Sequence, residues 1–210
     1  MFNSYINFLE NALQKPLPGS DAHKQMMPQG RTLHAPDDAR SYRNGAVLLH
    51  LFPIDDKPYL LFIKRSDDGK VHGGQIAFPG GKFENTDENL KQTALRESYE
   101  EVGLINALVL GALSNLYIPV STFMVHPFIS YSDNEQIWQP NAHEVETVIP
   151  ISLTELNHNK NKTIKPVIVS SGLQLQVPCY QINQEIIWGA TAMITNELLA
   201  ISKPFFNYSK

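Results

Sequence analysis

Several features are scarce or missing in this 210-residue sequence. It has one cysteine, Cys179, so no internal disulfide can form and we expect a reducing compartment. No apolar run approaches the roughly 18 residues that a membrane span needs, and the N-terminus lacks the basic leader and apolar run of a signal peptide. Only 18% of residues are charged and the net charge is -4, so a basic nucleic-acid-binding surface is not expected. These absences predict a cytoplasmic protein that binds neither a membrane nor a nucleic-acid polymer.

The chain does have the material for one well-filled domain. Hydrophobic residues make up 42% of it, and its length suits a single core. Near the N-terminus apolar residues recur at helical spacing, which predicts a helix over residues 4–14. The polar stretch 20–44 is rich in turn-forming residues and predicts a connecting arm. We therefore expect an N-terminal helix and arm over residues 1–44, followed by the main domain over 45–202.

The main domain alternates between strand-length apolar runs and helices. Runs 45–52 and 59–65 flank a turn-like Pro-Ile-Asp-Asp-Lys-Pro segment, which predicts a hairpin. A final helix is expected over 190–201, with its apolar residues turned inward. This order predicts an α/β fold with helices on the faces of a sheet. Further strands are expected at 108–118, 124–131, 145–151, 167–171 and 173–182.

A helix is also expected from about residue 87 to 102. Thr86 or Asp87 can cap its N-terminus, and Gly103 stands where a helix-ending glycine belongs. One face can pack on the sheet; its residues are Ala94, Leu95, Ser98 and Val102.

Three glutamates lie together on the other side of this helix. At about 100° per residue, Glu97 and Glu101 are about 40° apart, one turn above the other, and Glu100 falls beside them. Arg96 and Glu100 form an i, i+4 pair that can bond. Like charges at this spacing repel by a few tenths of a kcal/mol per pair, roughly. A divalent cation removes that cost, and Mg²⁺ prefers one or two carboxylates together with phosphate oxygens. The pattern therefore favours phosphate chemistry.

The alternative interpretation is a solvated acidic face, which is common on helices. The metal-site hypothesis is favoured by the order of the residues. Two glycines, Gly80 and Gly81, precede the helix in a Phe-Pro-Gly-Gly turn, where backbone can approach a ligand closely. Arg-Glu, Glu-Glu and glycine then follow at fixed spacing.

The stretch from Gly81 to Leu104, GKFENTDENLKQTALRESYEEVGL, resembles the Nudix box. Its characteristic end, Arg-Glu-x-x-Glu-Glu-x-Gly, is present in full. One departure is that Lys82 stands where the box has a glycine, so that the loop is one residue longer. As a result, either Asp87 or Glu88 takes the acidic position that precedes the helix.

Residues 60–81, LLFIKRSDDGKVHGGQIAFPGG, resemble the motif that precedes the box in the coenzyme A pyrophosphatase branch of this family. Lys70 occupies the place of an arginine, which keeps the charge but loses bidentate phosphate geometry. The segments LYIPVSTFMVHP and WGATA also resemble that branch, so the likeness covers most of residues 20–200.

The resemblance implies a Nudix-type α/β/α sandwich with a mixed sheet and a catalytic strand-loop-helix. It implies Mg²⁺ or Mn²⁺ held by Glu97, Glu100, Glu101 and the backbone carbonyl of Gly80 or Gly81, with Arg96 orienting the glutamates. The reaction implied is cleavage of coenzyme A, or an acylated form, into 3′,5′-ADP and 4′-phosphopantetheine or its acyl derivative.

Two points of the mechanism stay open at this stage. The general base is either a box glutamate, Glu97, or an acid from a later loop, for which Glu144 is the candidate. Arg65, Ser66, Lys70 and Gly80 are expected to contact the substrate. The basic residues could instead be solvated charges at the end of a strand.

Two other functions are weighed against this one. The first is a Nudix hydrolase for ADP-ribose or another nucleoside diphosphate derivative, against which the motif before the box argues. The second is a non-catalytic Nudix-fold binding module, but such proteins usually lose box carboxylates and this chain has them all. The partner is in each case a small nucleotide-like molecule. A homodimer is possible, because the N-terminal helix could cover either the core or a neighbouring subunit.

Four other residues have competing interpretations. His72 is expected in a turn and His126 as a hydrogen-bonded core residue. Cys179 has no basic neighbour to activate it, so a nucleophilic role is not expected. Trp188 could stack on an adenine, although packing beneath the last helix is favoured.

Overall fold

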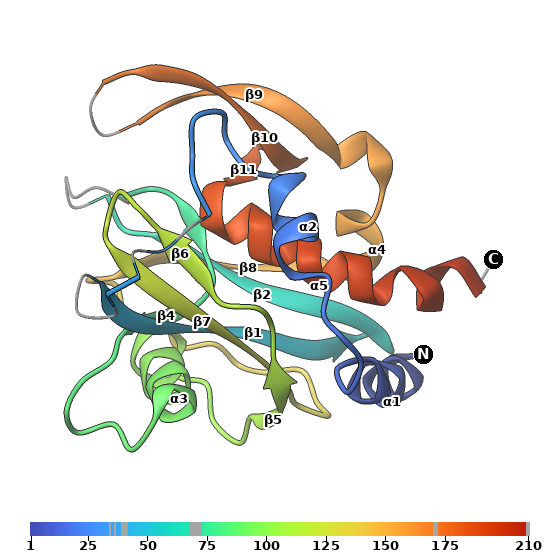
Figure 1. The fold of residues 1–210 in the computed structure, drawn as a ribbon. Helices are drawn as coiled ribbons and strands as arrows, with labels where there is room; N and C mark the ends of the chain where they lie inside the picture. Colours follow the sequence, from blue (N-terminus) through green and yellow to red (C-terminus); the bar gives the residue numbers. More distant parts are fainter. Residues whose placement is uncertain (34, 36, 39–41, 68–72, 170–171, 209–210) are drawn as a thin grey trace.

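The computed structural model describes the whole chain except residues 34, 36, 39–41, 68–72, 170–171 and 209–210. It is an α/β/α sandwich around an eight-stranded mixed sheet, as the sequence predicts (Figure 1). Helix α3 (Leu90–Val102) covers one face of the sheet, and the long helix α5 (Gly189–Tyr208) covers the other. A three-stranded sheet lies on the far side of α5 (Figure 1).

The central strands are hydrophobic on both faces because helices cover both. In β1 (Arg43–Ile54), Leu49 and Leu51 belong to the core beneath α5, whereas Ala46 and Leu48 belong to the core beneath α3. This alternation follows from the two-residue period of a strand. The near-continuous apolar run 45–52 is what a strand buried on both sides requires. The predicted hairpin with β2 (Lys57–Arg65) is confirmed, with Leu51 paired to Leu60.

The sheet opens where the candidate site lies. The strands β1 and β2 pair only between Leu51 and Ile54 on the β1 side. Beyond that point β3 (Ile76–Ala77) pairs with β2, and β4 (Gly80–Lys82) pairs with β1. The glycine turn is thereby inserted between the two long strands. On the other side of β1 runs β7 (Phe123–Tyr131), its parallel partner.

The remaining strands differ in part from the predicted runs. The run 108–118 divides into β5 (Leu108–Ala112) and β6 (Leu116–Ile118), which both pair with β7. The predicted strand 167–171 is wrong in its bounds, because β9 spans Lys162–Ile168 and its first half carries no apolar run. The other strands are β8 (Val145–Ser152), β10 (Gln174–Ile182) and β11 (Glu185–Trp188).

The N-terminal segment packs into the main core. Helix α1 spans Phe2–Ala12, two residues earlier than predicted at each end, and buries Phe2, Tyr5 and Leu9 in the core beneath α5. A short helix, α2 (Gly19–Lys24), lies along α5 (Figure 1). A boundary between residues 44 and 45 remains a prediction, since the two parts share one core. The other short elements are α4 (Leu153–Leu156) and the 3-10 turn η2 (Asn159–Asn161).

The final helix is longer than predicted, and it buries Met193, Ile194 and Leu198. Among the helices of the described residues, none is long and apolar enough to cross a membrane.

Candidate active site

Helix α3 holds the acidic residues and is fixed at both ends. Its N-cap is Asn89, whose side chain accepts a hydrogen bond from the backbone N–H of Gln92. The prediction of Thr86 or Asp87 as the cap is therefore wrong, because Asp87 is engaged elsewhere. Gly103 ends the helix in the left-handed conformation, with φ of 71°, as predicted. Ala94, Ser98 and Val102 are buried on the predicted packing face, but Leu95 is only half-buried.

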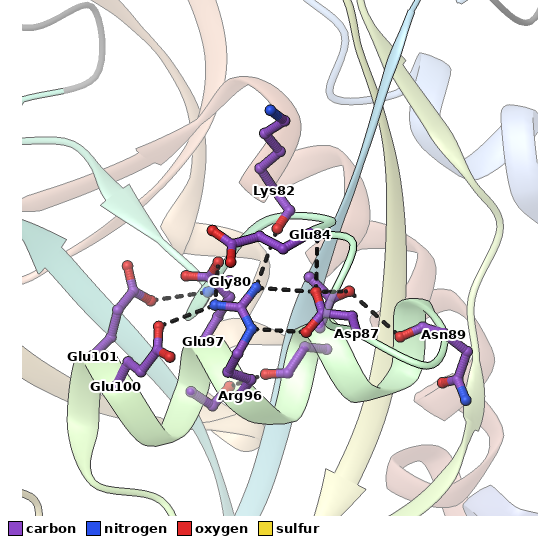
Figure 2. Close-up of polar contacts among 12 residues, drawn as sticks. Gly80, Lys82, Glu84, Asp87, Asn89, Arg96, Glu97, Glu100 and Glu101 are labelled. Carbon is purple, nitrogen blue, oxygen red and sulfur yellow. Dashed lines mark hydrogen bonds and ion pairs between the residues drawn. The ribbon is translucent and has the colours of Figure 1, made fainter.

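Glu101 is a buried carboxylate, so the alternative of a solvated acidic face is wrong for this residue. Only 1% of the residue is exposed. One oxygen accepts a hydrogen bond from the Gly80 backbone N–H at 2.9 Å (Figure 2). The other lies 3.4 Å from a guanidinium nitrogen of Arg65. Burial, with a smaller contribution from nearby Glu97 and Glu144, raises the pKa of Glu101 to about 7. The helix thus carries a carboxyl group that is costly to ionise without a cation.

Glu97 lies directly over the glycine turn. A Cβ atom at Gly81 would collide with the Glu97 carboxylate, so only glycine fits beneath it. The turn is also tight against β1, because a Cβ atom at Gly80 would lie 2.6 Å from the Val47 Cα atom. Burial raises the pKa of Glu97, as do the charges of Glu100 and Glu144, while Arg96 opposes the rise. The two glycines therefore let backbone and carboxylate meet at one place.

Arg96 connects the acidic groups. Its guanidinium Nη1 lies 3.0 Å from both Glu97 Oε1 and Glu100 Oε2, which confirms the predicted i, i+4 contact. Nη2 donates to the Lys82 carbonyl oxygen at 3.2 Å, and Asp87 accepts two further hydrogen bonds from the same side chain (Figure 2). Arg96 thus ties the helix to the loop that precedes it.

The segment after β2 lies beside a later loop that carries Glu144. Ser66 donates a backbone hydrogen bond to the Glu144 carbonyl oxygen at 2.9 Å, and its hydroxyl donates to the Ala142 carbonyl at 3.3 Å. The Glu144 side chain is exposed, and its charge contributes to the raised pKa of both Glu97 and Glu101. Residues far apart in sequence are therefore close in space here. Lys70 and His72 fall outside the described residues.

The donor set fits a hard divalent cation, although the carboxylates do not converge in this structure. Within the described ranges, no three His, Cys, Asp or Glu side chains form a group that could hold a metal ion. Glu100 is turned to Arg96, and Glu101 is bonded to Gly80 and Arg65. The chemistry of the two buried residues does fit. Glu97 and Glu101 offer the oxygen ligands that a hard cation prefers. Burial and neighbouring negative charge raise the pKa of both, and a bound cation would offset that effect.

A cavity of about 820 Å³ opens beside these groups. Its volume is in the range of about 300–1,000 Å³ typical of small-molecule sites. Gly80, Gly81 and Arg65 line it, and their contact with a substrate stays a prediction. Trp188, which is half-buried, lines it as well, so this side chain borders the cavity at the start of α5.

Two charged lining residues were not expected there from the sequence, Lys82 and Arg31. Arg31 belongs to the polar arm before β1, where no periodic pattern marks it. Two of the described histidines are structural. His126 is half-buried and bonded to Asn44, and the buried His50 is held between Ser130 and Ser132, with its pKa lowered by burial to about 3.

Comparison with known proteins gives a consistent family. The model of the NUDIX domain matches residues 42–170. An uncharacterized Nudix hydrolase NudL from Pectobacterium atrosepticum is 34% identical over 179 residues, which is 83% of this chain and 87% of that protein. The mitochondrial coenzyme A diphosphatase NUDT8 from Homo sapiens is 31% identical over 166 residues, 77% of this chain and 70% of that protein.

Solved structures include the MutT protein from Methanosarcina mazei Go1, with a TM-score of 0.48 and 17% identity over 85% of this chain and 99% of that one. The domain match spans more than half of the chain, and the two sequence relatives align along most of it. Because of this domain match and these two relatives, the chain belongs to the Nudix family, and it is a Nudix hydrolase.

Proposed function

We propose that this enzyme hydrolyses the diphosphate linkage of coenzyme A or an acylated derivative, with Mg²⁺ or Mn²⁺, to 3′,5′-ADP and 4′-phosphopantetheine or its acyl form. The observation that carries the proposal is the position of Glu97 and Glu101. Both lie at a glycine turn that lines a cavity of about 820 Å³. A diphosphate that enters there would meet the glycine backbone and Arg65, which are themselves in contact with the Glu101 carboxylate.

The choice of coenzyme A rests on sequence likeness. The motif of residues 60–81 is similar to the one that precedes the box in the coenzyme A branch. A relative at 31% identity is named a coenzyme A diphosphatase. Both observations support this substrate over other nucleoside diphosphate derivatives.

The site residues have two kinds of role: some would hold the metal ion, and others position its ligands or accept a proton. Glu97, Glu101 and Glu100 would hold the ion, with the backbone carbonyl of Gly81 as a further ligand. When bound, a divalent ion neutralises the diphosphate and polarises the phosphorus towards attack by water. Arg96 fixes the rotamer of Glu97 through its 3.0 Å contact.

Other groups handle the developing charge and the proton. Arg65 lines the cavity and is close to Glu101, so its guanidinium can stabilise charge on the phosphoryl oxygens. Ser66, Gly80 and Lys70 are proposed to contact the phosphates as well. A carboxylate oxygen of Glu97 or of Glu144 accepts the proton of the attacking water. Glu144 is exposed beside the site, and its charge already acts on Glu97 and Glu101.

The test is direct comparison of substrates. We expect the purified full chain, in Mg²⁺ or Mn²⁺, to hydrolyse coenzyme A with higher kcat/KM than dephospho-coenzyme A or ADP-ribose. Mass spectrometry of the products in ¹⁸O water identifies the attacked phosphorus, and chelation of the metal is expected to stop turnover. If ADP-ribose were the best of the three, the alternative Nudix function would replace this one. No turnover of any diphosphate would favour a binding module.

A further inference from the structure

Arg31 lies in the arm between α2 and β1, outside the 42–170 stretch that matches the family. It lines the same cavity as Gly80, Gly81 and Arg65. The arm thus contributes a cation to a site whose other groups come from the sheet and from α3.

The bonding of Arg31 is incomplete. One terminal nitrogen, Nη2, donates to the Tyr117 carbonyl oxygen at 3.1 Å. The Nε atom is buried and has no hydrogen-bond partner among the described residues. Burial lowers the pKa of Arg31 to about 10, and no described carboxylate offsets that effect. A buried polar atom without a partner is rare, and a buried cation is costly unless an anion meets it.

Of the other two cations that line the cavity, Lys82 is exposed beside the glycine turn, and Arg65 already has a partner. Arg65 lies 3.4 Å from the Glu101 carboxylate, so its charge is already countered. The part of the chain that the structure describes offers no such acid to Arg31. The two arginines therefore differ in what they can still bind, and Arg31 is the one open to an anion from outside the protein.

The strand that holds Arg31 and the strand that carries the glycine turn lie three positions apart in the sheet. Tyr117, which holds Arg31, pairs with Met124 on β7, and Met124 pairs with Asn44 on β1. The next strand across is β4 with its glycine turn. Three interstrand spacings amount to about 14 Å. A group bound at Arg31 is accordingly not the diphosphate at the glycine turn, but a second group of the same nucleotide-sized molecule.

We propose that Arg31 binds a phosphomonoester that the substrate carries apart from its diphosphate, and so selects substrates that have one. This inference rests on the proposed function, because in coenzyme A that group is the 3′-phosphate. A planar guanidinium suits such an anion because it can donate two parallel hydrogen bonds.

The experiment compares two substrates and two products that differ only in that phosphate. Arg31→Gln removes the charge and Arg31→Lys keeps it without the planar fork. Lys24→Gln is the matched control, since Lys24 is an exposed cation at the end of α2, just before the arm. For each variant, kcat and KM are measured on coenzyme A and dephospho-coenzyme A. Binding of 3′,5′-ADP and of AMP is measured by calorimetry.

We expect Arg31→Gln to lower the preference for coenzyme A over dephospho-coenzyme A by about tenfold or more, mainly through KM. Arg31→Lys should lower it less, and Lys24→Gln should leave it unchanged. The preference for 3′,5′-ADP over AMP should fall in parallel. An equal loss on both substrates would show that Arg31 only anchors the arm to Tyr117. An unchanged preference for coenzyme A in either Arg31 variant overturns the proposal.

The binding measurement separates this inference from the proposed function. If the wild-type protein fails to hydrolyse coenzyme A but still prefers 3′,5′-ADP through Arg31, the proposed reaction is wrong and the phosphomonoester site stands. If coenzyme A is hydrolysed and the Arg31 variants keep their preference, the proposed reaction stands and the phosphomonoester site at Arg31 is wrong. Should Arg31→Gln not fold, Arg31→Lys decides by the same two ratios.

Discussion

Asp87 and Arg96 form a bidentate pair that joins the loop before α3 to the helix itself. Asp87 Oδ1 accepts from Nε at 2.8 Å, and Oδ2 accepts from Nη2 at 3.1 Å. Thr93 and the backbone N–H of Glu84 also donate to Asp87. Arg96 holds the pKa of Asp87 well below its usual range, and the two other donors act in the same direction against burial. The acidic position left open between Asp87 and Glu88 is therefore filled by Asp87, while Glu88 is exposed.

We predict that Asp87→Asn lowers both stability and turnover. The charged pair is nearly buried, so its loss should cost about 2 kcal/mol of unfolding free energy. Turnover should fall about tenfold or more, because Arg96 is then less well fixed beside Glu97. Because the pKa of Asp87 is depressed, this stabilisation is present above the unfolded value of 3.8 and is lost as pH falls below it.

Glu88→Gln is the matched control for Asp87→Asn. It removes one negative charge from the adjacent, exposed position, and both its unfolding free energy and its kcat should stay near wild type. Chemical denaturation and steady-state kinetics measure the two effects. If Glu88→Gln proved the more damaging change, the assignment of Asp87 to the acidic position would be wrong.

We predict that Glu101→Gln and Glu97→Gln each lower kcat by about 100-fold or more at saturating Mg²⁺, since each removes a metal ligand. The fold should survive, because a glutamine oxygen can still accept the hydrogen bond that Gly80 gives to Glu101. Circular dichroism and thermal unfolding check this. Glu10→Gln on the exposed side of α1 is the control for loss of one charge. Near wild-type activity in either active-site variant would contradict the metal-site assignment.

The metal-free protein should lose stability as pH rises from about 4.5 to 7. The pKa of Glu101 is about 7 in the folded state against an ordinary value of 4.5, so folding takes up a proton in this range. At about 1.4 kcal/mol for each pH unit between the two values, the loss is on the order of 3 kcal/mol. Urea unfolding of chelator-treated protein at pH 5 and pH 8 measures it. In Glu101→Gln the pH dependence should be markedly smaller; an identical slope would refute the buried carboxyl as its source.

A buried pair fixes the N-terminal arm to the last helix. His23 Nε2 lies 2.9 Å from Glu197 Oε2, and Ser114 and the Gly19 backbone N–H also donate to Glu197. Burial opposes ionisation of Glu197, but the hydrogen bonds from His23 and Ser114 outweigh it and its pKa lies below the ordinary value. We predict that Glu197→Gln costs about 3 kcal/mol of unfolding free energy.

Glu197→Gln should leave the residues of the glycine turn and of α3 in place and affect only the attachment of the N-terminal arm. Its stabilising effect is present above pH 4.5 and declines at lower pH, so the variant and the wild type should converge in acid. Unfolding monitored at pH 7 and at pH 3 tests this, again with Glu10→Gln as control. A difference that grew towards low pH would contradict an ionised Glu197.

Sequence alone predicted the acidic helix because its information is local. A glycine at Gly103, the i, i+4 contact of Arg96 and Glu100, and the common face of Glu97 and Glu101 all follow from the helical repeat. The hairpin of β1 and β2 was equally local. The N-cap was misassigned because Asp87, a good capping residue by type, had a stronger partner nine positions away.

What only the tertiary structure decided depends on contacts between distant segments. The burial of Glu101 arises because the glycine turn inserts between β1 and β2 and covers it, which no helical pattern reveals. The approach of Glu144 to the site and the entry of Arg31 into the cavity likewise depend on the path of loops. The sequence thus determined which chemical groups the helix carries. The packing of remote strands and the arm determined their ionisation and their neighbours, because desolvation is a property of everything that surrounds a group.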